Sequence, residues 1–191
     1  SLPKPLCFEE LISSEASSIS WPNLDERAAS SLCYTSGTTG NPKGVLYSHR
    51  SILLHTFGML TFAADVGLTP SSTVLPVVPL FHANAWGLPF AVPLVGAKLV
   101  FPGAALDGAS LFSLMDRERV KAAWGVPTIW LGLLAEMRKQ KRKPQDFSFM
   151  LSGGSAVPRS MIQELEKEFG VDVTHGLSLI HISEPTRHER I

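Results

Sequence analysis

The sequence Leu32-Cys-Tyr-Thr-Ser-Gly-Thr-Thr-Gly-Asn-Pro-Lys-Gly44 combines glycines, hydroxyl side chains and one lysine in a short stretch. Glycines let backbone N–H groups approach phosphate oxygens, hydroxyls add hydrogen-bond donors, and a lysine adds a compact positive charge. The stretch is not a Walker A motif, because Pro42 and Gly44 stand where that motif requires a glycine and a serine or threonine. It therefore predicts a polyphosphate-binding loop of another class.

Apolar patterns on both sides of this loop predict an α/β fold. Short β-branched runs predict strands at residues 31–36, 45–48, 73–78, 98–101, 122–126, 149–152 and 171–174. Longer patterns of helical spacing lie between them. Strands that alternate with helices predict a largely parallel, buried sheet flanked by helices.

Several helix ends can be predicted from single residues. Asp107 is a candidate N-cap, and Pro127 and Pro158 stand at the starts of two further helices. Gly170 is a candidate terminator of the last helix. The first helix is predicted to have an apolar face formed by Ile52, Leu53, Phe57 and Leu60.

Composition narrows the class of protein. With 191 residues and 45% hydrophobic content, the chain has enough apolar material for one globular core. The 17 basic and 17 acidic residues balance, so there is no electrostatic case for a nucleic-acid partner. Cys7 and Cys33 lie far apart without metal-ligand spacing, which predicts reduced thiols and a cytoplasmic location.

Two segments bear on membrane contact. Residues 85–100 are apolar but short and interrupted by proline and glycine, so a buried helix followed by a buried strand is predicted there. The basic run 138–143 is interpreted as the solvated end of a helix, with contact to CoA phosphate or a membrane surface as the alternative. Peripheral membrane association and a homodimer stay open.

The run from Leu32 to Lys43 resembles, over its whole length, the phosphate-loop signature of the AMP-binding, adenylate-forming enzymes. A simple turn between strands would explain a bare Gly-Thr-Thr-Gly, but not the full run. Further stretches match the family in its order: Tyr47-Ser-His-Arg-Ser51, Pro79-Leu-Phe-His-Ala-Asn-Ala-Trp86, Leu94-Val-Gly-Ala97, Gly125-Val-Pro-Thr128 and Ser152-Gly-Gly-Ser-Ala156. The second and last of these look most like the branch that activates medium- and long-chain fatty acids.

This resemblance implies ATP, Mg²⁺ and coenzyme A as the small molecules bound. The residues implied to cradle the β and γ phosphates are Ser36, Gly37, Thr38, Thr39 and Gly40. Lys43 would lie beside these phosphates as a catalytic residue, and the Thr35 hydroxyl would help to hold Mg²⁺. In similar enzymes an aromatic or histidine side chain near the reacting carboxylate makes His82 the second catalytic candidate.

Other candidates surround the acyl and adenine positions. Trp86 comes four residues after His82, so on a helix both side chains could face one cleft, although plain core packing is an equal alternative for the indole. Similar enzymes seat adenine at the strand-to-helix turn that contains Gly153, Gly154 and Ser155, where backbone without Cβ atoms would admit a flat purine. His175 and Gly176 open the next family motif.

The match ends after Gly176. Residues 177–191 match nothing in the family and contain a string that resembles translated sequencing-adapter read-through, so we interpret them as artefactual. Residues 1–176 are expected to form part of the family's large domain, and the fragment alone is expected to be inactive. The predicted activity is that of a fatty acid–CoA ligase. The alternatives are an adenylate-forming ligase for an aryl or amino acid, and a non-catalytic nucleotide-binding remnant.

Overall fold

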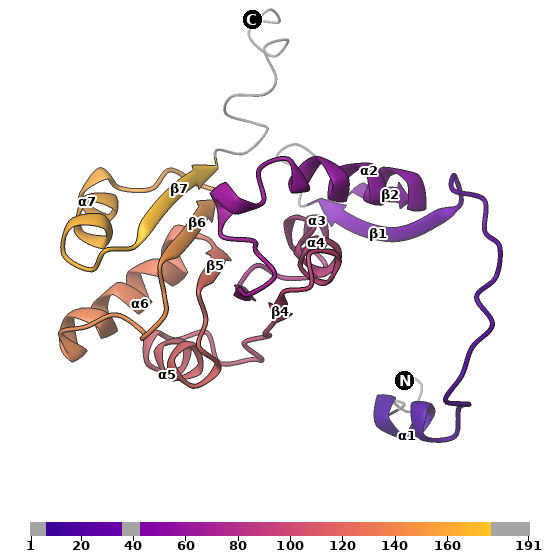
Figure 1. Ribbon diagram of the computed structural model, residues 1–191, viewed down its shortest axis with the longest axis horizontal. Coiled ribbons are helices and arrows are strands. Elements are labelled where there is room, and N and C mark those ends of the chain that lie inside the picture. The colour runs from indigo at the N-terminus through magenta and orange to yellow at the C-terminus, as the bar shows by residue number, and fades with distance from the viewer. Residues whose placement is uncertain (1–6, 36–42, 177–191) are drawn as a thin grey trace, which may run out of the picture.

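A computed structural model describes residues 7–35 and 43–176, and its strands form two sheets within those ranges (Figure 1). The larger sheet is parallel, with strand order β4-β3-β5-β6-β7. Its strands are β3 (Thr73–Pro76), β4 (Lys98–Leu99), β5 (Ala122–Gly125), β6 (Phe149–Gly153) and β7 (Asp172–Gly176). The strands β1 (Ala29–Thr35) and β2 (Lys43–Ser48) pair with each other as an antiparallel hairpin. The predicted α/β class with a largely parallel sheet is confirmed.

Helices lie on both faces of the parallel sheet (Figure 1). One face carries α5 (Gly108–Glu118), α6 (Pro127–Gln140) and α7 (Arg159–Lys167). The other carries α2 (His49–Leu60), η1 (Ala64–Val66), α3 (Ala83–Trp86) and α4 (Leu88–Leu94). A further helix, α1 (Phe8–Ser13), precedes the hairpin along the chain.

The central strands bury side chains on both faces, as their nearly continuous apolar sequence predicts. Successive side chains of a strand point to opposite faces. Leu75, Ala123 and Met150 therefore join the core beneath α5, α6 and α7, whereas Val74 and Ala122 join the core beneath α4. The sheet thus separates two apolar cores and contributes side chains to both.

Helix starts follow the predicted signals on the first face. Asp107 is the N-cap of α5, and its carboxylate accepts a hydrogen bond of 3.0 Å from the Ser110 N–H. Pro127 is the first residue of α6. Pro158 is the N-cap of α7 rather than part of its first turn. Gly170 has φ of 60°, as expected of a glycine beyond a helix end, although α7 ends at Lys167.

Two predictions about burial are wrong. In α2 the buried residues are Thr56 and Met59, whereas Leu53 and Phe57 of the predicted apolar face are exposed. Apolar residues occur on several sides of this helix, so their spacing does not single out the face that packs. The strand β4 has only two residues and lies at the sheet edge, where Lys98 is exposed, so it is not the buried strand predicted.

Charged side chains connect the C-terminal parts of α5, α6 and α7, and the segments that follow them, near the amino ends of the strands. Arg138 pairs with Glu164, Arg142 pairs with Asp116, and Lys143 donates a hydrogen bond of 2.7 Å to the Gly170 carbonyl. The hydrogen bond from Arg142 lowers the pKa of Asp116, and that from Arg138 lowers the pKa of Glu164. The basic run 138–143 therefore joins α5, α6 and α7 at this edge rather than only being solvated.

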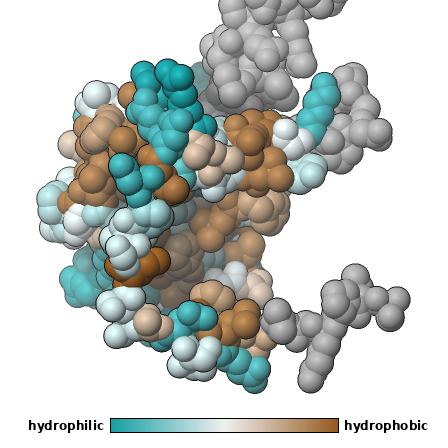
Figure 2. Space-filling model, turned by 90° about the vertical axis from the view of Figure 1, so that its right-hand side faces the viewer, coloured by the Kyte–Doolittle hydropathy of each residue, from teal (hydrophilic) through white to brown (hydrophobic). Residues whose placement is uncertain are grey.

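Exposed apolar side chains gather on the side of the hairpin and α2 (Figure 2). They include Leu46, Leu54 and Tyr34, each more than half exposed. In the described ranges, no helix has both the length and the apolar content needed to cross a bilayer.

Candidate functional site

The hairpin holds the two ends of the predicted phosphate loop opposite each other. The register of β1 and β2 pairs Thr35 with Lys43, the last and first residues of the two strands. Lys43 has an exposed side chain at this end of the hairpin. The predicted phosphate-binding residues Ser36, Gly37, Thr38, Thr39 and Gly40 lie outside the described residues.

A turn with left-handed backbone conformation follows His82. Ala83, Asn84, Ala85 and Trp86 have φ angles of 45°, 51°, 47° and 55°, and Gly87 follows with φ of 83°. Each non-glycine residue in this left-handed region costs roughly 1–2 kcal/mol, so such runs persist only where surrounding contacts hold them. We call residues 83–87 the left-handed turn.

The Asn84 side chain attaches this turn to the hairpin. Its Nδ2 donates a hydrogen bond of 3.0 Å to Ser31 Oγ, and its Oδ1 accepts one of 3.5 Å from the Cys33 thiol. Cys33 is buried, and Ser31 is half-buried. The side chain thus joins the turn to the strand that leads into the phosphate loop.

Gly87 attaches the turn to α2. A Cβ atom on Gly87 would lie 2.6 Å from His55 Cε1 and 3.0 Å from Met59 Sδ. Both the close approach of α2 and the positive φ therefore require glycine here.

Trp86 attaches the turn to the parallel sheet. Its ring centroid lies 6.5 Å from that of Trp124 on β5. A Cβ on Gly153 would lie 2.9 Å from Trp86 Cη2 and 3.0 Å from the Gly176 carbonyl oxygen. The missing Cβ of Gly153 therefore makes room for the indole and for β7, and the predicted contact of Gly153 with adenine stays a prediction.

The second glycine of the pair begins the turn after β6. Gly154 has φ of 81°, and the Ser155 carbonyl oxygen lies 3.2 Å from His175 Nε2 on β7. The register also places Gly153 opposite Gly176. Gly153, Gly154, Ser155, His175 and Gly176 thus come together at the carboxyl edge of the sheet, with Trp86 against them.

His82 immediately precedes the left-handed turn. Its side chain is exposed, and its backbone N–H donates a hydrogen bond of 3.1 Å to the Pro79 carbonyl. The argument that placed His82 and Trp86 one turn apart assumed a regular right-handed helix, and the backbone of residues 83–86 does not form one. The half-buried Trp86 contacts the sheet, so core packing accounts for part of its role.

Buried polar atoms without a hydrogen-bond partner within the described ranges are Trp124 Nε1, Trp130 Nε1 and Ser152 Oγ. Trp124 and Ser152 belong to β5 and β6 one residue before each strand ends, and Trp130 lies in the first turn of α6. Such groups are costly in a protein interior, and functional sites are among the places where they occur.

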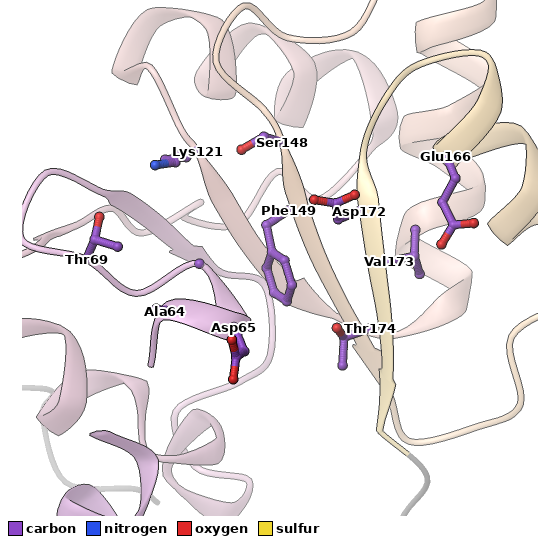
Figure 3. Close-up of a pocket in the computed structure, with 11 residues that line it drawn as sticks. Ala64, Asp65, Thr69, Lys121, Ser148, Phe149, Glu166, Asp172, Val173 and Thr174 are labelled. Carbon is purple, nitrogen blue, oxygen red and sulfur yellow. The ribbon is translucent and has the colours of Figure 1, made fainter. Parts of the chain in front are cut away.

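A cavity of about 470 Å³ lies at the opposite, amino edge of the sheet (Figure 3). Its lining includes Asp65 of η1, Lys121 and Ser148 before β5 and β6, and Asp172 at the start of β7. None of the predicted site residues that the structure describes lines it. Across residues 7–35 and 43–176, no group of three His, Cys, Asp or Glu side chains is arranged to hold a metal ion.

The residues that sequence reasoning missed are Ser31, Cys33, Asn84 and His55, which hold the left-handed turn in place. Asn84 stood within a matched motif, and asparagine tolerates the left-handed conformation better than most residues, which was the available signal. Its partners on β1 lie more than 50 residues away in sequence, at separations of 51 and 53, and no local pattern could pair them.

Comparisons with known proteins identify relatives of this chain. A family model described as "AMP-binding enzyme" matches residues 4–178. The medium-chain-fatty-acid–CoA ligase of Ectopseudomonas oleovorans is 51% identical over 183 residues, which are 95% of this chain and 33% of that protein. The 3-methylmercaptopropionyl-CoA ligase of Ruegeria pomeroyi is 49% identical over 176 residues, 92% of this chain and 32% of that protein.

A solved structure shows the same fold. The anthranilate CoA ligase AuaEII in complex with anthranoyl-AMP superposes with a TM-score of 0.79 at 25% identity. The match covers 93% of this chain and 35% of that one. The chain spans about a third of the length of the curated relatives it matches.

Proposed function

The chain belongs to the AMP-binding enzyme family, and from this membership we propose that the protein containing it is a fatty acid–CoA ligase. Sequence similarity to a ligase of medium-chain fatty acids over 95% of the chain supports this choice. The substrates would be a fatty acid, ATP with Mg²⁺, and coenzyme A. The predicted cytoplasmic location, membrane association and homodimer stay predictions.

The reaction has two steps. A carboxylate oxygen attacks the α-phosphorus of ATP, the bond between the α-phosphorus and the bridging oxygen breaks, and pyrophosphate leaves. The CoA thiolate then attacks the acyl carbonyl, and AMP leaves with the electrons of the acyl–oxygen bond. Positioning and compensation of negative charge supply most of the catalysis in such phosphorus chemistry.

Some residues of this chain would bind the pyrophosphate that leaves the α-phosphorus, and others would bind the attacking carboxylate and the adenine. Residues 36–40 and Lys43 would bind the β and γ phosphates that become pyrophosphate. Thr35 would contribute one oxygen to Mg²⁺, an ion that takes its other ligands mainly from water and phosphate. His82 would lie beside the carboxylate, and the Gly154–Ser155 turn with His175 and Gly176 would seat adenine.

The observation that supports this arrangement best is the left-handed turn. It contacts the hairpin of the phosphate loop through Asn84 and the predicted adenine turn through Trp86. His82 immediately precedes this turn. The turn contacts both predicted nucleotide-binding segments, so His82 is connected to each of them through it. Ligand binding at the carboxyl edge of a parallel sheet is also the general rule.

A relative named for a 3-methylmercaptopropionyl thioester is almost as similar to this chain as the fatty-acid enzyme is. A short thioether acid is therefore a second candidate substrate. Aryl and amino acids, and a remnant that binds nucleotide without turnover, remain the alternatives to test.

The test is ATP–pyrophosphate exchange in the protein at the full length of its gene. The acids would be acetate, octanoate, palmitate, 3-methylmercaptopropionate, benzoate and a mixture of amino acids. Exchange with octanoate or palmitate is expected. Exchange with another acid alone would keep the chemistry and change the substrate, whereas ATP binding without exchange for any acid would contradict the proposal.

A further inference from the structure

Both ends of the Asn84 amide are used on the same strand. The donor end bonds Ser31 Oγ at 3.0 Å, and the acceptor end receives the Cys33 thiol at 3.5 Å. Ser31 and Cys33 are two residues apart on β1 and therefore share a face of that strand. The amide serves both partners at once, because its N–H donates to the hydroxyl while its oxygen accepts from the thiol.

The backbone of Asn84 gives a second reason for asparagine. Its φ and ψ of 51° and 43° lie in the left-handed region, which asparagine enters more readily than other residues with a Cβ. One side chain therefore favours the conformation of the turn and also fixes where the turn lies against β1.

The hydrogen bonds of Asn84 lie close in sequence both to the phosphate loop and to the predicted catalytic histidine. Thr35, at the start of the phosphate loop, is two residues beyond Cys33, and His82 is two residues before Asn84. We propose that Asn84 is a positioning residue of the adenylation step, which sets the carboxylate side of the site relative to the pyrophosphate side. The inference rests on the proposed function, and Asn84 itself would not touch ATP.

The two steps of the reaction would depend on this link differently. Adenylation needs the phosphate loop and the His82 segment in a fixed relation, because the attacking and leaving oxygens must lie in line. Thioester formation starts after pyrophosphate has left, so the phosphate loop has no reacting group to place. A misplacement of about 1 Å can slow a reaction about a hundredfold, and here the slowing would fall on the first step.

The experiment compares the two steps in variants of the full-length protein. Asn84→Gly keeps access to the left-handed backbone and removes the amide, whereas Asn84→Asp keeps an acceptor to which the Ser31 hydroxyl can donate. Ser31→Ala removes the partner, and Ser30→Ala, on the neighbouring exposed position of β1, is the matched control. The measurements are kcat and KM of ATP–pyrophosphate exchange, thioester formation from synthetic acyl-adenylate and CoA, and Tm.

For Asn84→Gly we expect kcat of exchange to fall about tenfold to a hundredfold, with thioester formation from acyl-adenylate close to wild type. Asn84→Asp should recover part of the loss. Ser31→Ala should lower exchange less, and combining it with Asn84→Gly should add little, because the Asn84–Ser31 hydrogen bond is already lost in Asn84→Gly. Ser30→Ala should behave as wild type.

Three results would overturn the inference. Exchange by Asn84→Gly equal to that of wild type would show that the link does not position reacting groups. An equal loss in both steps, in proportion to a lower Tm, would show a structural role alone. A wild-type protein that exchanges with no acid would overturn the proposed function and this inference with it, so the two failures are distinguishable.

Discussion

The two edges of the parallel sheet are held together by different kinds of contact. At the amino edge, ion pairs such as Arg142 with Asp116 connect the ends of helices, and the non-glycine residues with positive φ there, Arg119 and Lys141, are single helix C-caps. At the carboxyl edge the structure has a left-handed turn, a glycine packed against an indole, and buried polar atoms without partners in the described ranges. The amino edge contributes stability, whereas the carboxyl edge keeps costly features that a purely structural edge would not need.

This difference separates features that stabilise from features that position. Exposed ion pairs contribute little individually and tolerate substitution. Strained backbone and close glycine contacts persist only where neighbouring elements hold them. We therefore expect substitutions at the amino edge to change stability slightly and leave activity intact, and substitutions near the carboxyl edge and hairpin to change activity most.

The largest effect is expected for Lys43→Ala at the end of the hairpin. If Lys43 compensates the charge of the β and γ phosphates as proposed, its loss should lower kcat of ATP–pyrophosphate exchange in the full-length protein by about a hundredfold or more. The control is Lys139→Ala at the end of α6, an exposed lysine beside Glu136 at the amino edge. Equal activity of the Lys43 variant and wild type would remove Lys43 from the proposed site and weaken the contrast between the regions.

Gly153→Ala should destabilise the protein by about 1–3 kcal/mol, because the new methyl group meets the Trp86 ring and a backbone carbonyl. The backbone carbonyl cannot move aside as a flexible side chain would. The free energy of unfolding from urea titration measures the change, and equilibrium binding of AMP would report separately on the turn predicted to seat adenine.

Gly58→Ala is the matched control for that substitution. Gly58 lies in α2 with no heavy atom within 4 Å of a new Cβ, so alanine should raise the free energy of unfolding by about 0.5–1 kcal/mol. If Gly153→Ala were equally harmless, the packing of Trp86 on Gly153 would be wrong.

The smallest effect concerns acid sensitivity of the amino edge. Asp116 and Glu164 have lowered pKa values in the folded protein because Arg142 and Arg138 donate hydrogen bonds to them. Their contribution to stability is therefore present above their unfolded pKa values, about 3.9 and 4.3, and is lost as pH falls through the lower folded values.

An Arg138→Gln, Arg142→Gln double variant tests this sensitivity. Its Tm should decline less than that of wild type as pH falls below about 4, while exchange activity near neutral pH stays unchanged. Arg159→Gln, which removes a similar charge from the start of α7, is the control. A parallel decline in all three proteins would exclude these ion pairs as the source of acid sensitivity.

How much the sequence predicts also differs between regions. The strands other than the short edge strand β4, the α5 cap at Asp107 and the start of α6 at Pro127 depend on local patterns, and the structure confirms them. The exposed side of α2 was predicted wrongly because apolar residues surround that helix. Which residues of α2 become buried then depends on the elements that pack against it, and the spacing of apolar residues does not specify those elements.

The matched motifs predicted the residues of the candidate site. They did not predict the contacts that hold those residues together. The motif around His82 supplied the residues, but not the left-handed backbone, because among residues 83–86 only Asn84 favours positive φ locally. Likewise the reason for glycine at position 153 became clear only when Trp86, from a distant segment, was placed against it.

The hydrogen bond from Asn84 to Ser31 also has a consequence for folding kinetics, since it joins residues 53 apart in sequence. The two strands of the hairpin are close in sequence, whereas this bond joins the hairpin to the left-handed turn, and both must form before the bond can. The entropic cost of closing a loop grows with its length. We expect the bond to form after the folding transition state. Asn84→Gly should then speed unfolding in a chevron analysis and leave the folding rate nearly unchanged.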